Sequence, residues 1–484
     1  MTHHTRPIQA TYLYVLSLII CLSWAVSCQK QNGGSDVKLI FSCENNTLTF
    51  DTVFTSIPSI TKRFTAYNPS KSDVTTSIYL AGGTKSKFSI NVNGMPGTHF
   101  KDVTIPAKDS IFIFIKVNID PTTDKNLPFL ITDSIVFMSD SRTQDVDLIA
   151  YGQDANYIVA DKGSGYLRYK VVASEHQTVT WTKDKPYVVY GWAVIDSTAT
   201  LIIEPGTKIY FHNSSGLWAY RSSNLKVNGT LTEPVLFRGD RLEAWYNEDY
   251  AQWEKIWINE GAHVDINYAV ITNAFIGVQV DPLVTTEGIF LAPTHVKIEN
   301  TIIKNTKNSG VLARFLSLEM INCVIANNGG CGVQLEIGEY TMKHLTIANY
   351  FMQAERKNPA CFVSNKISDL LYSDISAYKI KADFINCIIT GNNDTEVGVN
   401  KATGAELEAS FKNCLVKSKN NADFFIECLH NEDPLFTDKS KLDFTLLPAS
   451  PAIGKGRPNI GVNEDILGNS RGNPPDIGAY QFKR

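Results

Sequence analysis

Two arginines are the residues of this chain best placed for acid-base chemistry. Arg314 directly follows an apolar stretch at 310–313, and Arg356 lies in a long polar insertion that also contains Lys366 and Asp369. A polysaccharide lyase needs a basic group that takes the proton beside a uronate carboxylate, with a cation such as calcium neutralising that carboxylate. We favour a solvated surface arginine at each position and assign no catalytic residue. Arg314 and Arg356 are the candidate catalytic residues if the chain is a lyase.

A cluster of aromatic residues suggests a second kind of chemistry. All the tryptophans beyond the N-terminal segment fall between 181 and 257, in acidic company: Trp181, Trp192, Trp218, Trp245, Trp253 and Trp257. Aromatic rings stack on the C–H faces of sugars, and carboxylates accept hydrogen bonds from sugar hydroxyls. We predict a sugar-binding set in the polar loop, comprising Trp245, Tyr246, Tyr250 and Trp253. The alternative is that these tryptophans fill the wide end of a solenoid and its cap.

A short repeated phrase between His263 and Ser418 must position these side chains. It reads Asn-Cys-Val-Ile at 322–325, Asn-Cys-Ile-Ile at 386–389 and Asn-Cys-Leu-Val at 413–416, and the segments starting at 268, 300 and 344 share its columns. The six anchors are 32, 22, 22, 42 and 27 residues apart. Alternating apolar residues before each phrase predict strands, and so short a period built from strands predicts a solenoid.

A unit near 22 residues holds three short strands and three turns, which is one coil of a parallel β-helix. These rungs, and the opening stretch 201–211 with its Pro205-Gly206 corner, resemble the right-handed parallel β-helix repeat proteins. We expect this β-helix over 196–430, with insertions at 281–293 and 350–380 leaving the coil at a similar place and building a binding face. The pectin hydrolases of this fold carry Asn-Thr-Asp, Asp-Asp and Gly-His-Gly, and none of these strings occurs here. The resemblance therefore implies architecture and no particular reaction.

Residues 37–153 follow a different pattern, with strands broken by turn residues every eight to twelve positions. This predicts a β-sandwich of immunoglobulin-like kind. The stretch 64–69 resembles the major-sperm-protein-like immunoglobulin domains of bacterial surface lipoproteins. The whole chain is thus predicted to be all-β, an immunoglobulin-like β-sandwich followed by a right-handed parallel β-helix. We expect 154–195 to link the two and cap the first coil, and the tail 431–484 to cap the last one.

The first residues look like a targeting segment. Arg6, an apolar run over 12–25 and the sequence Ala25-Val26-Ser27-Cys28 resemble a bacterial lipobox, which implies a signal peptide over 1–27 and lipidation of Cys28. Residues 28–36 then form a polar tether. We expect an outer-membrane lipoprotein that faces the periplasm or the cell surface, with the membrane as its first partner. The alternative is a simple secretory signal.

The cysteines and histidines suggest no cofactor. Cys323, Cys387 and Cys414 occupy one column of the repeat, which indicates stacked core thiols, and no pair has CxxC spacing. His263 and His295 share another column, and we interpret them as stacked polar edge residues. Glu319, Glu336 and Asp383 fall in different columns and do not form an obvious metal cluster. We predict no metal site and no cofactor; calcium is conceivable, but no motif supports it.

The composition of the chain limits the classes of partner that it can bind. The chain has 484 residues and a net charge of −4, and it lacks basic runs, which argues against nucleic acid. We favour a lipid-anchored, non-catalytic β-helix, monomeric, that binds a polysaccharide, a glycoprotein or another envelope or host component. The alternative is a polysaccharide lyase or glycoside hydrolase with a divergent site in the groove between the insertions, which leaves open whether the chain is an enzyme.

Overall fold

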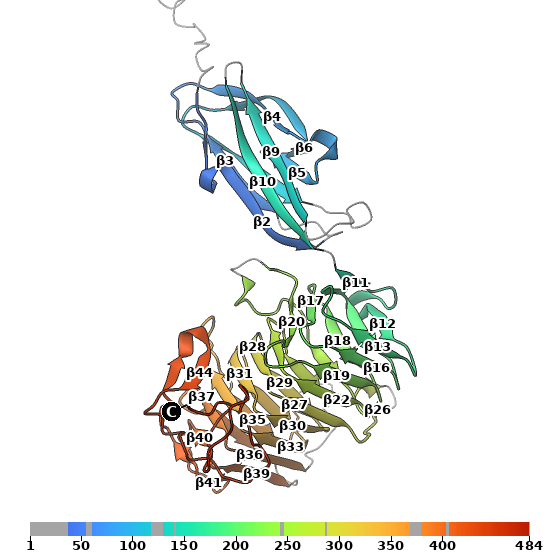
Figure 1. The fold of residues 1–484 in the computed structure, drawn as a ribbon, viewed down its shortest axis with the longest axis vertical. Coiled ribbons are helices and arrows are strands. Elements are labelled where there is room, and N and C mark those ends of the chain that lie inside the picture. The colour runs from blue at the N-terminus through green and yellow to red at the C-terminus, as the bar shows by residue number, and fades with distance from the viewer. Residues whose placement is uncertain are drawn as a thin grey trace, which may run out of the picture. The chain divides into compact units, whose positions relative to one another are not determined.

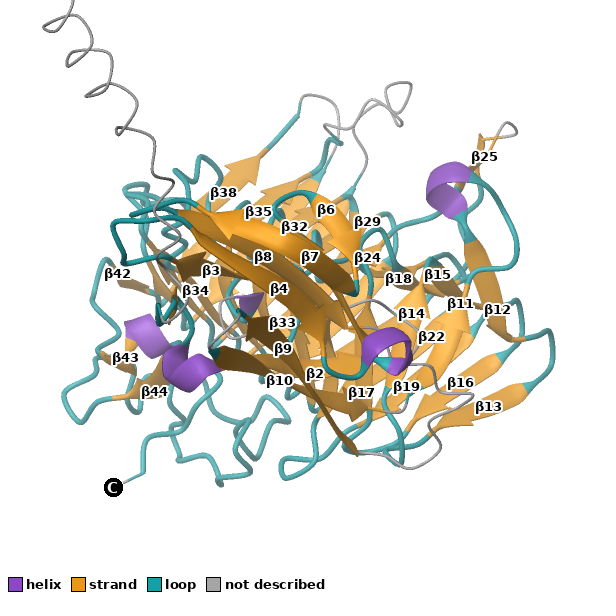
Figure 2. Cartoon of the chain, turned by 90° about the horizontal axis from the view of Figure 1, so that it is seen from above, coloured by secondary structure: helices purple, strands orange, loops and turns teal. Residues whose placement is uncertain are grey.

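The computed structural model describes residues 37–54, 61–117, 129–139, 142–153, 155–242, 246–285, 288–367, 379–402 and 406–483. The predicted signal peptide, Cys28 and the tether lie outside these residues. The chain divides into two compact units, Met1–Asp154 and Ala155–Arg484, each described here by itself. Within the described residues, no helix is both long and apolar enough to cross a membrane. Figure 1 and Figure 2 show a chain built almost entirely from strands, and its short 3-10 helices include η1 (Glu44–Asn46), η2 (Gly83–Lys85), η3 (Gly165–Leu167) and η6 (Lys439–Lys441).

The first unit is a β-sandwich, as predicted. One sheet has the order β1 (Ile40–Phe41), β3 (Lys62–Tyr67), β8 (Ser110–Val117), β5 (Phe88–Val92) and β6 (Met95–Gly97). The other has the order β2 (Thr47–Phe54), β10 (Thr143–Gln153), β9 (Phe129–Met138), β4 (Val74–Leu80) and β7 (His99–Ile105). Alternate residues of β8 are buried, and they join Phe64, Ile78 and Phe137 in one apolar core between the sheets.

The second unit is a parallel β-helix, which confirms the predicted fold class. Sheet 1 contains β11 (Asn156–Val159), β14 (Tyr187–Tyr190), β17 (Lys208–Phe211), β20 (Val235–Gly239), β23 (Ala269–Thr272), β28 (Ile302–Thr306), β31 (Val324–Asn328), β34 (Thr346–Asn349), β37 (Ile388–Gly391), β40 (Leu415–Val416) and β42 (Leu429–His430).

Two further parallel sheets complete each coil. Sheet 2 contains β12 (Tyr169–Ala173), β15 (Trp192–Ile195), β18 (Gly216–Ala219), β21 (Ile256–Ile258), β24 (Val278–Val280), β29 (Val311–Arg314), β32 (Val333–Glu336), β35 (Cys361–Ser364) and β38 (Val397–Asn400). Sheet 3 contains β13 (Thr178–Trp181), β16 (Thr200–Ile203), β19 (Asn224–Asn228), β22 (His263–Asn267), β27 (His295–Glu299), β30 (Ser317–Ile321), β33 (Gly338–Lys343), β36 (Ile380–Ile385), β39 (Leu407–Lys412) and β41 (Phe425–Ile426).

The repeated phrase forms the corner between sheet 3 and sheet 1. Its first residue has a left-handed backbone, with φ between 46° and 57° at Tyr268, Asn300, Asn322, His344, Asn386 and Asn413. Asparagine tolerates this conformation better than other non-glycine residues, which explains why it recurs at this point. The next position points into the core, where Cys323, Cys387 and Cys414 are fully buried. Stacking one such residue per coil produces the continuous core of the solenoid.

The first coil starts earlier than the sequence suggested. The stretch 154–195 was predicted to be a linker and cap, yet β11, β12 and β13 already pair in parallel with β14, β15 and β16. Trp181 stacks on Tyr187 with ring centroids 4.4 Å apart, near this end of the core. The sequence did not reveal this extension, because only the later coils carry the Asn-containing phrase.

The C-terminal tail lies along the outer face of sheet 1. The sequence had predicted that it caps the last coil. Its hairpin β43 (Phe436–Asp438) and β44 (Asp443–Leu446) and the residues Ala452, Ile466 and Ile477 form an apolar cluster with outward-facing residues of sheet 1, namely Val324, Ala326, Ala348, Ile388 and Leu415. The tail therefore covers the side of the later coils, where strands β31, β34 and β37 are largely buried on both faces.

Candidate functional site

The three outer faces of the β-helix differ in chemistry. The tail covers the outer face of sheet 1 in the later coils, from β31 to β40. The outer face of sheet 3 carries one register-aligned row of polar side chains, Lys226, Asp265, Lys297, Glu319, Thr341, Asp383 and Ser410. The outer face of sheet 2 instead combines aromatic, amide and ionisable side chains, which makes it the candidate site.

A single row of outward-pointing residues runs along sheet 2, and we call it the central column. In register from coil to coil it consists of Trp218, Trp257, Gln279, Leu312, Gln334 and Phe362. The column follows from strand geometry: side chains alternate between core and surface, and parallel in-register pairing stacks equivalent positions. The rings of Trp218 and Trp257 stack with centroids 4.7 Å apart.

A network of hydrogen bonds ties this column to a buried carboxylate. Asp281 accepts a hydrogen bond from the indole N–H of Trp257 at 2.6 Å and another from the amide of Gln279 at 2.6 Å. The ammonium of Lys255 donates to Gln279 Oε1 at 2.7 Å. Burial raises the pKa of Asp281 above its ordinary value, and the hydrogen bonds from Trp257 and Gln279 act in the opposite direction. The network fixes the orientation of Gln279 and of the Trp257 ring.

Arg314, the first candidate catalytic residue, belongs to this network but is buried. Its Nε donates to Glu336 Oε2 at 2.8 Å, and its Nη1 lies 3.9 Å from Asp281 Oδ2. Gln334 of the central column donates to the other oxygen of Glu336 at 2.8 Å. The Arg314 side chain is 8% exposed and that of Glu336 is 0% exposed. The expectation of a solvated surface arginine is therefore wrong, and the geometry places Arg314 as a bridge between two buried carboxylates.

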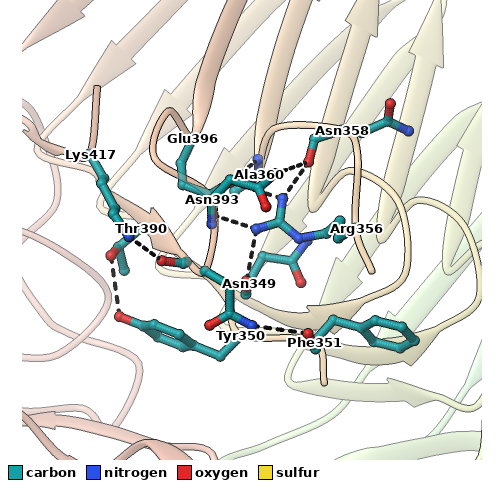
Figure 3. Close-up of polar contacts among 12 residues, drawn as sticks. Asn349, Tyr350, Phe351, Arg356, Asn358, Ala360, Thr390, Asn393, Glu396 and Lys417 are labelled. Carbon is teal, nitrogen blue, oxygen red and sulfur yellow. Dashed lines mark hydrogen bonds and ion pairs between the residues drawn. The ribbon is translucent and has the colours of Figure 1, made fainter. Parts of the chain in front are cut away.

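Arg356, the second candidate, is also an internal ion-pair residue (Figure 3). Both its terminal nitrogens contact the carboxylate of Glu396, one of them at 2.9 Å, and it also donates to the carbonyls of Asn349 and Asn358. Glu396 in turn accepts from the backbone N–H of Ala360 at 2.7 Å. The Arg356 side chain is 1% exposed. Its role is to hold the loop between β34 and β35 against the coil.

The predicted sugar-binding set does not form one surface. Trp245 lies outside the described residues. Trp253 is 1% exposed, stacks on Phe211 at 4.3 Å and donates its indole N–H to the carbonyl of Thr272 at 2.8 Å, so it is a core residue. Tyr246 and Tyr250 are half-buried on the loop. The guanidinium of Arg241 lies 4.2 Å from the Tyr246 ring centroid, and the Tyr250 ring packs on Phe351.

The insertions border sheet 2 on both of its edges. Residues 240–242, 246–255 and 350–360 lie at the corner between sheets 1 and 2. Residues 281–285, 288–294 and 365–367 follow strands of sheet 2 at its corner with sheet 3. Strand β35 divides the longer predicted insertion into two loops at different corners. Gln353 donates to the carbonyl of Glu248 at 3.2 Å, which joins two of these loops across intervening coils.

A small cavity marks the second of these corners. It has a volume of about 330 Å³ and lies beside the hairpin of β25 (Val284–Thr285) and β26 (Gly288–Ile289), lined by Ile289, Leu291, Phe315, Ile337, Gly338, Glu339, Lys379 and Lys381. Its walls are largely apolar, and Lys379 is already paired with Glu406 and Glu408.

Among the described residues, one group of donor atoms suits a metal ion, and it lies on sheet 3. Donor atoms of His263, Asp265 and His295 come within 4.8 Å of one another. The group contains a single carboxylate, whereas Ca²⁺ takes roughly six to eight oxygen ligands. The sequence showed that the two histidines share a column. It did not reveal Asp265 as their partner, although a residue two positions along a strand points to the same side.

Comparisons with known proteins add little. No family model matches the chain, and no curated protein matches it. Among solved structures, part of the chain resembles a family 123 glycoside hydrolase from Clostridium perfringens that was studied for glycolipid glycan hydrolysis. The identity is 11%, the TM-score is 0.19, and the match covers 23% of this chain and 23% of that chain. So limited a likeness carries no argument about function.

Proposed function

We propose that this chain is a lipid-anchored protein of the cell envelope whose β-helix binds an extended glycan along the outer face of sheet 2. The observation that carries the proposal is the central column. It presents aromatic, amide and aliphatic side chains in one straight row at the spacing of neighbouring coils, roughly 4.8 Å. A regular row of this kind suits a ligand that is itself a chain of repeated units.

The residue types support a sugar ligand. Gln334, which is half-buried, offers an amide group, and the half-buried Trp257 and Phe362 supply apolar surface for the C–H groups of a sugar ring. Gln279 and Leu312 are buried in the column between Trp257 and Gln334. The ring of Phe362 packs over Gly398, where an added Cβ would lie 3.1 Å from its Cδ2. A larger residue at 398 would push this ring off the sheet. The insertions on both edges of sheet 2 provide further contacts for a long ligand.

The enzyme alternative rests on Asp281, Glu336 and Arg314. Hydrolysis of a glycosidic bond uses two carboxyl groups, and Asp281 has the raised pKa of a potential acid. The side chains of Asp281, Arg314 and Glu336 are 4%, 8% and 0% exposed, however, and their polar atoms are engaged with one another. A general acid must come within hydrogen-bond reach of the group it protonates. The present arrangement therefore favours binding over turnover.

The test combines a glycan array with a turnover assay, using the full chain in detergent with acidic and neutral polysaccharides. We expect binding without turnover, weakened about tenfold or more by Gln334→Ala or Phe362→Ala. Glu319→Ala on the outer face of sheet 3 is the matched control and should bind as the parent does. New unsaturated ends, or reducing ends that disappear in Asp281→Asn, would contradict the proposal and identify an enzyme.

Membrane attachment is tested separately through Cys28. Lipidation at this residue would place the chain in the membrane fraction and incorporate labelled fatty acid. We expect Cys28→Ser to abolish labelling and to release the protein, whereas Cys21→Ser should change neither. Full labelling of Cys28→Ser would exclude the proposed anchor.

A further inference from the structure

The outer face of sheet 3 carries a feature that glycan binding does not use. We propose that His263, Asp265 and His295 form a binding site for a divalent transition-metal cation, with Zn²⁺ the ion that their chemistry fits best.

The three donors converge on one point. His263 Nε2 lies 3.3 Å from Asp265 Oδ2, and His295 Nε2 lies 3.3 Å from Asp265 Oδ1. Zinc binds imidazole nitrogen at about 2.0–2.1 Å in tetrahedral geometry, so neighbouring ligand atoms should be about 3.3–3.4 Å apart. Each histidine nitrogen thus already has this separation from an oxygen of Asp265, and all three donor groups lie within 4.8 Å of one another. Rotation of the carboxylate brings a single oxygen toward both nitrogens.

The backbone holds this arrangement in place. His263 and His295 are register partners on the paired strands β22 and β27, and Asp265 is two residues along β22 on the same side. The two imidazole rings stack with centroids 4.4 Å apart and an interplanar angle of 21°. Sites built on strands keep their ligands better positioned than sites on loops, because the pairing fixes the Cα atoms. Imidazole binds a metal in the plane of its ring, so the stacked rings must rotate about their side-chain torsions to share an ion, but the backbone need not move.

The donor set selects the class of ion. Two imidazoles and one carboxylate suit Zn²⁺ and its transition-metal neighbours better than Ca²⁺ or Mg²⁺, which prefer all-oxygen sites. All three side chains are exposed at their outer ends, at 51%, 43% and 51%. Three protein ligands on an exposed face leave the fourth tetrahedral position open to solvent, where water or a donor from a partner can bind.

The neighbouring charges set the strength of the site. Lys226 and Lys297 are the register partners of Asp265 on either side, and their positive charges oppose a cation. The ammonium of Lys297 is held 2.9 Å from Glu299, which offsets one of these charges. The second lysine keeps the affinity below that of a buried zinc site, so we expect micromolar binding. Lys226→Gln should strengthen it severalfold.

The experiment is calorimetric titration of the full chain with Zn²⁺ alone. If the unprocessed chain is used, it carries His3→Ala and His4→Ala as the background, so that these two histidines of the predicted signal peptide do not compete. We expect one equivalent to bind, with affinity reduced at least tenfold in His263→Gln, His295→Gln and Asp265→Asn. His176→Gln is the matched control, because His176 is an exposed histidine beside a carboxylate, 3.8 Å from Glu175.

A second readout guards against variants that misfold. Co²⁺ substituted for Zn²⁺ should show the visible absorption of a tetrahedral complex, and X-ray absorption should report two imidazole nitrogens. Binding that is equal in His263→Gln, His295→Gln and the background protein would overturn the proposal, as would an octahedral Co²⁺ spectrum. Because the site is on sheet 3, its failure would leave glycan binding by sheet 2 unaffected, and the converse also holds.

Discussion

The outer faces of sheet 1 and sheet 2 are made by the same coils, but the tail covers only the face of sheet 1. Sheet 1 presents Val324, Ile388 and Leu415, and the chain covers them with its own tail. Sheet 2 presents a column of tryptophan, glutamine and phenylalanine, and the chain places insertions along its edges instead. An apolar face needs a permanent cover, whereas a mixed face can remain available to a ligand. The comparison supports the proposal that sheet 2 binds the ligand, while the covered face of sheet 1 contributes to stability.

The largest expected effect is at the corner that separates these two faces. Arg356→Ala leaves the carboxylate of Glu396 buried without its partner, and loss of one member of a buried ion pair costs roughly 3–5 kcal/mol. Chemical denaturation should measure this loss. Lys419→Ala breaks the exposed pair with Asp394, whose side chains are 68% and 76% exposed, and should leave stability unchanged. Equal effects of the two substitutions would show that Arg356 is not the internal support of the loop.

The second largest effect tests whether packing of the tail on sheet 1 stabilises the β-helix. Ile477 is 1% exposed and packs in the cluster with Ile388 and Val324, so Ile477→Ala should cost about 2–4 kcal/mol by leaving a cavity. Amide hydrogen exchange should accelerate in β31, β34 and β37. Exchange rates that change in β29 and β32 but not in β31 would place the tail elsewhere.

The free energy of unfolding should also depend on pH, because His344 is buried between the solenoid and the tail. This residue is fully buried; its Nδ1 donates to the carbonyl of Gly478, and its Nε2 accepts from Asn386 at 3.0 Å. Burial, assisted by the charge of Arg471, lowers its pKa well below the ordinary value. His344 therefore takes up a proton at about pH 6.5 in the unfolded chain, whereas in the folded chain it stays neutral at that pH.

The pKa of His344 is lower in the folded chain than in the unfolded chain, so a fall in pH favours unfolding. Stability is full above about pH 6.5 and falls as the pH drops, by up to roughly 1.4 kcal/mol per pH unit. Denaturation between pH 7 and pH 5 should show a shallower pH dependence in His344→Asn than in the parent. His176→Asn, which changes an exposed histidine, should keep the parental slope. A parental slope in His344→Asn would rule out this histidine as the titrating group.

The smallest effect belongs to the charged row on sheet 3. Glu319 contacts Lys343 at 3.0 Å, with side chains 34% and 23% exposed, and such pairs contribute only about 0.2–1 kcal/mol. Glu319→Ala should therefore lower the melting temperature by no more than a few degrees. A larger loss would mean that the outer face of sheet 3 is structurally as important as that of sheet 1.

Much of the fold could be predicted from the sequence, because the coils of a β-helix repeat at intervals that are visible in the sequence. The recurring Asn marks a corner that needs a left-handed backbone, and the residue after it marks the core. The position of the tail could not be predicted, since its apolar residues do not repeat and the cluster that they form includes residues as far apart in sequence as Val324 and Ala479. Local sequence indicates that such a segment is apolar but not which face it covers.

The candidate site was harder to predict for a related reason. Arg314 and Arg356 look like surface residues until the coils are stacked, because their partners Glu336 and Glu396 come from later coils. Trp253 looked like part of an exposed loop, although it fills the core beside Phe211. The true row of outward-facing residues on sheet 2 required the register of each coil. Insertions of different lengths obscure that register in the sequence.

The central claim is that a glycan lies along sheet 2, and hydrogen exchange with and without a glycan identified on the array tests it most directly. The account predicts that protection is gained in β21, β24, β29, β32 and β35 and in the flanking loops, while β22, β27 and β30 of sheet 3 exchange as before. Protection confined to sheet 3, to the tail or to the β-sandwich would contradict the account.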